Sequence, residues 1–540
     1  MPRRSLSQSS FFAPEFVMPD CLEPGTTPWL LAKYRSTLYP SWLFAGWKGE
    51  GRRGRKAWPA VTLMTLLVLR WSEEGMSRLG STKRARWDVQ WRAAMGLNCE
   101  IQVPDEKTLR EFEAFLQQRH PACDIPRYML LHEHIVRLCI KNGVVKKGAM
   151  WAMDSTPMWC YGAVLDTVRL LGDGTRMLAI QWAKAIGSDL EQVAEQWRLP
   201  FLLAKSTKGF FPINWKDRQD RGEVVKTLAQ GVMDAVKVVK RHIDLAPKKR
   251  RKRLLRRCAR LLRVIQQDLE TDDEGALVVA RRVAKDRLIS MTDPQARHGH
   301  KSQTRQFNGF KVHLLGELCS GLIASLTVTQ GNRFDGKVGH RLIRRAKALE
   351  ESISMVLGDT AYGGAELRYM ASNLCNVSLV APPPSFRPPP PGRLDREAIQ
   401  IDFDARTATC AAGVCTDDCV WLWSEKYQHY TFKFRWSVET CRSCHLRQAC
   451  MGKAIRGHRL LLNPFEQQMR QARKDWQEPD VRETYRKRSQ CERLVNQMTR
   501  HGARRARAWG LRAAHLQAHL IAMRCNLALL ARTLAENLET

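Results

Sequence analysis

The chain has 540 residues, of which 88 are Lys or Arg and 54 are Asp or Glu, so its formal net charge at pH 7 is +34. That charge favours a polyanionic partner, because each Lys or Arg that meets a phosphate releases a condensed counterion. Residues 1–16 lack the apolar core of a signal peptide, and the apolar run 61–69 is about half of the ~20 residues that span a bilayer. We therefore expect a soluble cytoplasmic protein with two to four structural units, which binds nucleic acid and no membrane.

The first 145 residues are expected to be helical. Residues 104–119 carry acidic residues in their first turn and an apolar stripe formed by Leu109, Phe112 and Leu116. The segment before them is basic, with Lys83, Arg84, Arg86 and Arg92. This pattern fits a helix-turn-helix DNA-binding unit, and it fits a basic helical bundle without groove contacts equally well.

From residue 146 the pattern becomes mixed. A short apolar strand is expected to end at Asp154, and a charged helical stretch covers about 185–285. Within that stretch, ten of the seventeen residues 247–263 are Lys or Arg. We interpret this run as a packed helix with a phosphate-facing surface, although it also resembles a nuclear localisation signal.

A strand hairpin, a helix and two further strands are expected next. The hairpin pairs 307–317 with 321–329, the helix covers 338–351, and strand 353–357 stops just before Asp359. After one more strand at 376–381, the proline-rich segment 382–392 indicates a linker.

Asp154 and Asp359 thus follow short apolar strands in the same way. A single aspartate at a strand end is usually a turn former, but two that meet in one cleft repel each other unless a divalent cation neutralises them. The pair therefore indicates a metal site. We interpret the nearby Asp166, Asp293 and Asp335 as supporting or turn-forming carboxylates.

A third carboxylate is Glu492. If residues 485–496 form one helix, Tyr485, Arg488, Glu492 and Asn496 share a face. A solvated ion pair between Arg488 and Glu492 is one explanation. The other places Glu492 on the metal ions and Arg488 on a phosphate.

These residues carry a family resemblance. The two aspartates and the Tyr485-x2-Arg488-x3-Glu492 helix resemble the DDE transposases of bacterial insertion sequences, within the IS-four/IS-five superfamily and the insertion-sequence group numbered 1182. The segments "MDSTPMWCYGAVLDT", "VTQGNRFDG" and "GDTAYGG" are similar to the blocks around the aspartates in that group. One position departs from the family pattern, because Thr499 stands where the family has Lys.

The resemblance implies an α/β, ribonuclease-H-like (retroviral-integrase-like) mixed sheet with helical insertions. It implies a catalytic triad of Asp154, Asp359 and Glu492 that binds Mg²⁺ or Mn²⁺, cuts the element's ends and transfers the strands into target DNA. The implied partners are the terminal inverted repeats and target DNA, with a homodimer forming on DNA near the bacterial nucleoid. DNA contacts are expected from Tyr485, Arg488, Arg500, Arg504 and Arg505.

Two other functions remain open. One is a catalytically inactive or domesticated, zinc-containing DNA-binding protein. The other is a ribonuclease-H-like nuclease without a role in transposition. The three acidic residues favour the transposase, because a protein that only binds DNA does not require them.

The chain has 16 cysteines, and six of them fall between positions 410 and 450. Cys441-x2-Cys444 matches one half of a structural zinc site, with Cys450 as a third ligand. Cys410, Cys415, Cys419 and His445 are candidates for the fourth, and the family resemblance favours Cys410. Unligated thiols are the alternative.

We expect four regions. Residues 1–145 form the helical DNA-binding domain, and 146–380 form the catalytic core with its basic helical insert. Residues 381–463 contain the linker and a zinc-ribbon-like insertion, and 464–540 supply helices that complete the core.

Overall fold

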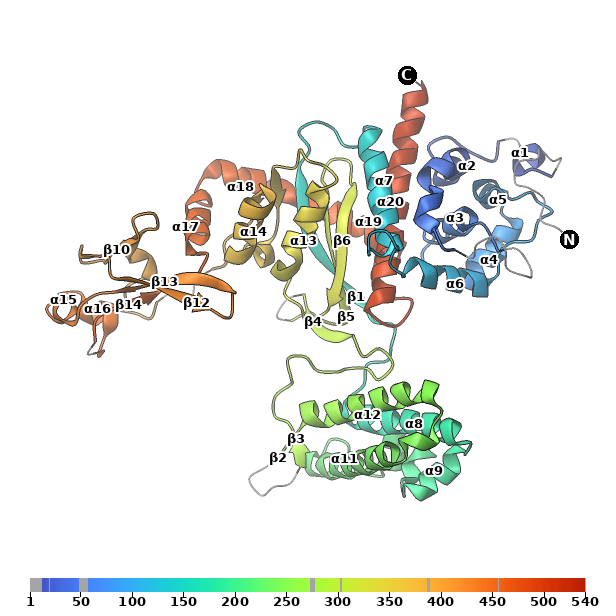
Figure 1. Ribbon diagram of the computed structural model, residues 1–540, viewed down its shortest axis with the longest axis horizontal. Coiled ribbons are helices and arrows are strands. Elements are labelled where there is room, and N and C mark those ends of the chain that lie inside the picture. Colours follow the sequence, from blue (N-terminus) through green and yellow to red (C-terminus); the bar gives the residue numbers. More distant parts are fainter. Residues whose placement is uncertain are drawn as a thin grey trace.

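The computed structural model describes residues 12–18, 20–47, 57–271, 277–301, 304–385, 389–454 and 456–539. A mixed sheet lies at the centre, with the N-terminal helices on one side, a Cys-rich unit at the other end and a helical unit below (Figure 1). The fold is therefore α/β with large additions to one sheet.

The central sheet has six strands, in the order β4–β5–β1–β7–β8, with β6 also paired to β5. β5 is antiparallel to β1, β4 and β6, whereas β7 is parallel to both β1 and β8. The strands are β1 (Trp151–Trp159), β4 (Arg297–His300), β5 (Gln306–Glu317), β6 (Ile323–Gln330), β7 (Met355–Leu357) and β8 (Ser378–Val380). The hairpin and the two short strands expected from the sequence are confirmed.

The N-terminal region is helical, as expected. Its helices are α1 (Pro14–Val17), α2 (Thr27–Leu38), α3 (Ala60–Arg70), α4 (Arg78–Trp87), α5 (Val89–Met95), α6 (Glu106–Leu116) and α7 (Arg127–Lys141). Polar side chains cap several of them; for example, the Asp105 carboxylate accepts the Thr108 N–H at the start of α6. Helices α2 to α7 share one continuous apolar core with the sheet and with α20 (Leu511–Glu539).

Arg92 does not lie on the surface that we considered for DNA binding. It is 4 % exposed, and its guanidinium donates to the backbone carbonyls of Ala85 and Arg86. Buried polar groups need such partners, so this arginine stabilises the turn around it.

The helical insert begins earlier than expected, at Thr167, and its helices end at Asp268. It contains α8 (Thr167–Ile186), α9 (Leu190–Gln196), α10 (Thr207–Phe210), α11 (Arg218–Arg241) and α12 (Lys248–Asp268), followed by the hairpin β2 (Leu269–Thr271) and β3 (Leu277–Val279). Its apolar side chains form a core of their own. The insert is therefore a separately packed unit.

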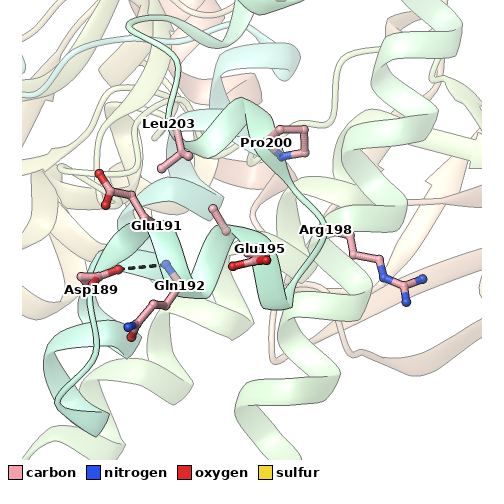
Figure 2. A pocket seen from close by; sticks show the side chains of 8 residues that line it. Asp189, Glu191, Gln192, Glu195, Arg198, Pro200 and Leu203 are labelled. Atoms are coloured by element: carbon pink, nitrogen blue, oxygen red, sulfur yellow. Dashed lines mark hydrogen bonds between the residues drawn. The ribbon is translucent and has the colours of Figure 1, made fainter.

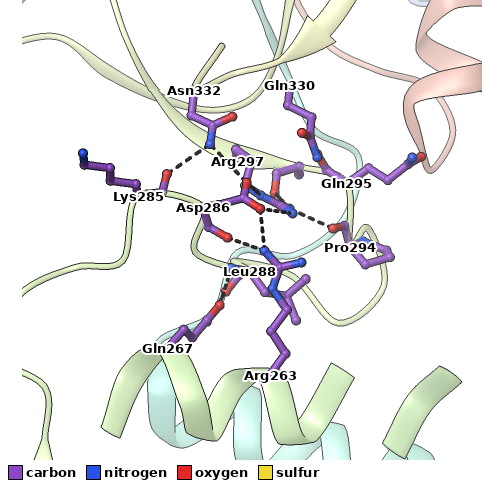
Figure 3. Close-up of polar contacts among 11 residues, drawn as sticks. Arg263, Gln267, Lys285, Asp286, Leu288, Pro294, Gln295, Arg297, Gln330 and Asn332 are labelled. Atoms are coloured by element: carbon purple, nitrogen blue, oxygen red, sulfur yellow. Dashed lines mark hydrogen bonds and ion pairs between the residues drawn. The ribbon is translucent and has the colours of Figure 1, made fainter. Parts of the chain in front are cut away.

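Asp286 links the helical insert to the central sheet through hydrogen bonds (Figure 3). Its carboxylate accepts from Arg263 of α12 and from Arg297 of β4, each at 2.6 Å, and from the Asn332 amide at 3.2 Å. These donors, Arg297 foremost, lower the pKa of Asp286 far below its ordinary value. Asp286 is therefore ionised, and it joins α12 to β4.

The Cys-rich unit has two three-stranded sheets and two short helices. The sheets are β9 (Gln400–Asp402), β10 (Thr407–Thr409) and β11 (Cys415–Thr416), and β12 (Cys419–Ser424), β13 (His429–Arg435) and β14 (Arg459–Leu461). The helices are α15 (Val438–Arg442) and α16 (Arg447–Met451). The core is small. Part of the proline-rich linker, residues 386–388, lies outside the described residues.

The remaining helices connect that unit back to the sheet. They are α13 (Gly336–Lys347) and α14 (Ala365–Cys375) beside β6, β7 and β8, and then α17 (Glu466–Asp475), α18 (Pro479–Arg486) and α19 (Cys491–Met498). Among the helices of the described ranges, none is both long enough and apolar enough to cross a bilayer.

Candidate active site

Asp154 lies in the middle of β1 and not at its end, which corrects the sequence-based expectation. β1 continues through Pro157 to Trp159 because β5 pairs with it along its whole length. The opposite edge is different, since β7 pairs only with Trp151 and Ala152. Beyond those residues, β7 does not pair with this edge of β1. Pro157 fits there, because a strand edge tolerates a residue that has no N–H to donate.

Asp359 is placed next to Asp154 by the parallel register. Trp151 pairs with Val356 and Ala152 with Leu357, so continuing the same offset by two residues puts Asp154 beside Asp359. β7 has ended by then, and Asp359 turns the chain by accepting the Ala361 N–H at 3.0 Å. The sequence-based expectation that the two aspartates meet is consistent with this register.

Arg488 joins the two carboxylates. Its Nη2 atom lies 3.2 Å from Asp154 Oδ2 and 3.9 Å from Asp359 Oδ2. Those two oxygens are therefore at most 7.1 Å apart, the sum of the two distances. A single guanidinium thus balances two carboxylates, and the local charge remains negative.

Asp335 is a third carboxylate at this site. Its oxygens accept from Ser155 Oγ at 2.5 Å and from Lys311 Nζ at 2.6 Å. Ser155 directly follows Asp154 in β1, so Asp335 contacts the same strand. It lies at the beginning of α13, where the sequence alone suggested only a supporting or turn-forming role.

Burial and like charge act together on the two aspartates. Burial raises the pKa of the Asp154 carboxyl, and the charges of Asp359 and Asp335 raise it further, against the opposing effect of Arg488. Burial likewise raises the pKa of Asp359, with Asp335 adding to it and Arg488 opposing it. Added positive charge at this place would therefore favour the ionised carboxylates.

Glu492 is not brought into this cluster. Residues 487–490 form a 3₁₀ turn between α18 and α19, so the helix expected over 485–496 is interrupted. Because a 3₁₀ helix has about 3.0 residues per turn, successive side chains are separated by a larger angle around the helix axis than in an α-helix. Arg488 then turns inward, while α19 buries Cys491, Leu494 and Met498 and leaves Glu492 exposed. Glu492 and Asn496 lie four residues apart in α19 and are both exposed, whereas Arg488 precedes α19 in the 3₁₀ turn and contacts the aspartates, so the expected common face is formed only in part.

The other predicted DNA contacts occupy two places. Tyr485 lies beside Arg488 and packs edge-on against Trp476, with ring centroids 5.0 Å apart. Arg500, Arg504 and Arg505 are exposed and follow α19. The Thr499 hydroxyl donates to the Asn496 carbonyl at 3.1 Å, so this residue has a local backbone partner.

The four cysteines proposed for zinc lie together. The charges of Cys441, Cys410 and Cys444 add to burial in raising the pKa of Cys450. A cavity of about 40 Å³ is lined by all four thiols and by His458, whose Nδ1 lies 3.6 Å from Cys450 Sγ. His458 is not among the ligands expected from the sequence, and it approaches the thiols because β14 folds back against β13.

The aspartate site does not coincide with the open pocket shown in Figure 2. That pocket, of about 550 Å³, lies on the helical insert, and its lining includes Asp189, Glu191, Glu195 and Arg198. Its acidic lining is unsuited to a polyanion.

In the part of the chain that the structure describes, no group of three or more His, Cys, Asp or Glu side chains is arranged to hold a metal ion. This holds for the aspartate site, where Glu492 is exposed, and also for the four cysteines, which line one cavity without forming such a group. The chemistry of the donors still fits a divalent cation, because carboxylate oxygens are the ligands that Mg²⁺ and Mn²⁺ prefer.

Two segments of the chain match family models, and both models are described as a transposase DDE domain. They cover residues 280–383, which include Asp359, and residues 409–531, which include Arg488 and Glu492. Asp154 lies outside both segments. Comparisons with curated proteins and with solved structures give no match. The two family matches support a DDE transposase and agree with the coarser part of the resemblance seen in the sequence.

Proposed function

We propose that this protein is a transposase that cuts DNA at the ends of a mobile element and joins those ends to target DNA. The observation that carries the proposal is the pair Asp154 and Asp359, whose Oδ2 atoms lie within 7.1 Å of each other, one on β1 and the other just after the neighbouring strand β7. Both family matches agree with it.

The sheet supports a ribonuclease-H-like core. The resemblance implies an aspartate on the first strand of a mixed sheet and another after the fourth. Asp154 lies on β1, and Asp359 follows β7, which is the fourth strand of the sheet in chain order if the short β4 is set aside and the fifth if it is counted. The finer assignment to the insertion-sequence group numbered 1182 belongs to the same proposal.

Asp154 and Asp359 are the residues that would hold Mg²⁺ or Mn²⁺. When bound, a pair of such ions activates the attacking oxygen and stabilises the leaving oxygen. Arg488 bridges the same two carboxylates, and we propose that it moves to a DNA phosphate when the cation binds.

The cutting reaction forms a bond between a water oxygen and the scissile phosphorus and breaks the bond from phosphorus to the 3′ oxygen. The products are a 3′-hydroxyl and a 5′-phosphate: the attacking water loses a proton to solvent, and the leaving 3′ oxygen takes up a proton from solvent. In the joining reaction, that 3′-hydroxyl oxygen attacks a phosphorus of target DNA, and the target's own 3′ oxygen leaves with a proton. Neither step forms a covalent bond between protein and DNA.

The third carboxylate is the point on which the structure and the sequence motif differ. Glu492 follows the family pattern but is exposed, whereas Asp335 already lies at the site. We propose that Glu492 turns inward when DNA and metal bind, and that Asp335 holds Ser155 and Lys311 in place.

The test is cleavage of a plasmid that carries the coding sequence with its flanking DNA, in the presence of Mg²⁺, Mn²⁺ or EDTA. Asp154→Asn, Asp359→Asn and Glu492→Gln should each remove metal-dependent cutting, whereas Asp335→Asn should reduce it. Asp166→Asn is the matched control, because that carboxylate caps α8 in the insert. Activity that survives Glu492→Gln but not Asp335→Asn would make Asp335 the third ligand.

A DNA-binding protein without catalytic activity is the second candidate. The exposed position of Glu492 and the Thr499 departure favour it. DNA binding with no cutting in any metal, by the wild-type chain and by all variants alike, would establish it in place of the transposase.

The zinc site, the dimer and the N-terminal DNA contact belong to the same proposal. Cys410, Cys441, Cys444 and Cys450 would hold a structural Zn²⁺, which would stabilise a unit whose own core is small. A homodimer would allow two element ends to be cut together. The N-terminal helices would bind the terminal repeats.

A further inference from the structure

Three aromatic side chains and two arginines form an exposed patch at the far end of β1. Trp159 is 44 % exposed, Tyr161 49 % and Trp509 59 %. Tyr161 packs edge-on against Trp509, with ring centroids 5.5 Å apart. Arg504 and Arg505 are also exposed. We call these five residues the aromatic–arginine platform, and we propose that it stacks unpaired bases of the DNA strand that leads to the aspartate site.

The platform is held rigidly by backbone contacts. The Trp159 N–H donates to the Arg504 carbonyl, and the Ala506 N–H donates to the Trp159 carbonyl, each at 2.8 Å. The Gln517 amide donates to the Arg505 carbonyl at 2.8 Å, and the Gly510 N–H donates to Asp293 at 3.2 Å. Side chains on a fixed backbone lose little freedom when a ligand binds.

The exposure of these three rings is not explained by contacts within the protein. Single exposed apolar residues are ordinary, but a contiguous group marks a binding surface. Trp159 packs against Phe307 with centroids 6.5 Å apart, so one side of the indole is supported while nearly half of the side chain faces solvent. Aromatic faces of this kind stack any base, because every base has a π-face.

The arginines determine which partner fits. Within the described ranges, neither Arg504 nor Arg505 has a carboxylate within ion-pair distance. Positive charge beside aromatic rings is the pattern of surfaces that bind single-stranded nucleic acid, in which arginines follow the backbone and rings hold the bases. An apolar protein partner would leave both guanidinium groups unpaired at the interface.

The position of the platform fits the cutting reaction. Trp159 is five residues beyond Asp154 on the same strand, which corresponds to about 17 Å at ~3.4 Å per residue. At the ~3.4 Å rise per nucleotide of a duplex strand, that is roughly five nucleotides, and it is fewer for an unpaired, extended strand. Because five is an odd number of residues, the side chains of Asp154 and Trp159 leave β1 on opposite faces, so a DNA strand that reaches both has to pass around this end of β1. This inference rests on the proposed function.

The test uses forked oligonucleotides, each a duplex that ends in two unpaired thymidine tails with 2-aminopurine in one tail. Stacking on an aromatic ring quenches 2-aminopurine fluorescence, and Mg²⁺ is left out so that no cutting occurs. Wild-type protein should quench the probe. Trp509→Ala and Trp159→Ala should lose the quenching and bind the fork about 5- to 150-fold more weakly, the range expected for one base stack. Trp509→Phe should keep most of both.

Two controls separate the explanations. Trp423→Ala removes an equally exposed tryptophan (46 %) from the Cys-rich unit and should change nothing. A blunt duplex with 2-aminopurine paired to thymine should bind wild type and Trp509→Ala alike. Equal weakening on the fork and the duplex, or no quenching by a wild-type protein that binds the duplex, would overturn the platform alone. Failure of the wild type to bind either DNA would overturn the proposed function as well.

Discussion

Replacing Asp293 with asparagine removes a buried charge and leaves an oxygen that accepts the Gly510 N–H. Asp293 is fully buried, and its Oδ1 lies 3.2 Å from the Gly510 nitrogen. This contact fixes the segment that carries Arg504, Arg505 and Trp509. The substitution therefore tests whether the segment needs the negative charge of Asp293 or only an oxygen that accepts the Gly510 N–H.

The size of the effect follows from the pKa. Burial raises the pKa of Asp293 from 3.8 to about 6, against smaller opposing effects of hydrogen bonds and Arg297. Because the folded-state pKa is the higher one, the protein loses stability as pH rises from about 4 to about 6, and the loss is constant above that window. At ~1.36 kcal/mol per pKa unit, ionised Asp293 costs about 3 kcal/mol. The uncharged amide of the Asp293→Asn variant has no such cost.

The assay is the difference in unfolding free energy between Asp293→Asn and wild type, measured from pH 4 to pH 8. We expect a difference near zero at pH 4 that grows to about 3 kcal/mol in favour of the variant above pH 6. Asp166→Asn, which removes an exposed carboxylate, should show no such rise. A variant less stable than wild type at pH 8, or a difference that does not change with pH, would refute the reasoning.

Three further predictions concern other parts of the molecule. Glu113→Ala should lower the free energy of unfolding by about 3–5 kcal/mol, because Glu113 pairs with Arg70 at 2.8 Å and Arg78 at 2.6 Å and its loss leaves the buried Arg70 without a carboxylate; an unchanged thermal midpoint would contradict this. Without metal, the carboxyls of Asp154 and Asp359 should each take up a proton at a pH above 3.8, measured by carboxyl-carbon NMR, because burial raises the pKa of both groups; a pKa at or below 3.8 for either group would count against it. Elemental analysis should find one zinc per chain in the wild type and less in Cys444→Ser, whereas exposed Cys415→Ser should keep it; zinc-free wild-type protein would exclude the site.

The sequence predicted the strands well because their periodicity and turns are local. The hairpin β5–β6 and the strand before Asp359 follow directly from apolar runs bounded by turn residues. The course of β1 did not follow, because Ser155, Thr156 and Pro157 look like a strand break. Pairing with β5, about 160 residues away in the chain, extends the strand through them, and pairing of this kind is not visible in a local pattern.

The sequence identified the main residues of the candidate site, but it did not predict how they are arranged in space. Asp154, Asp359 and Arg488 do come together. The directions in which Arg488 and Glu492 point, however, depend on a 3₁₀ turn at 487–490. No residue in "KRSQ" marks that turn. Asp335 and His458 were missed as neighbours for a related reason, since both reach their clusters through tertiary folding.

The apolar core that runs from the N-terminal helices through the sheet to α20 has a consequence for where the chain acts on DNA. Helices that share a core with the sheet cannot swing independently of it, because interior side chains are close-packed. Any DNA held by those helices therefore lies at a constant distance from Asp154 and Asp359. The number of base pairs between the recognised sequence and the cut would then be a fixed property of the fold, and changing it would require rebuilding the interior.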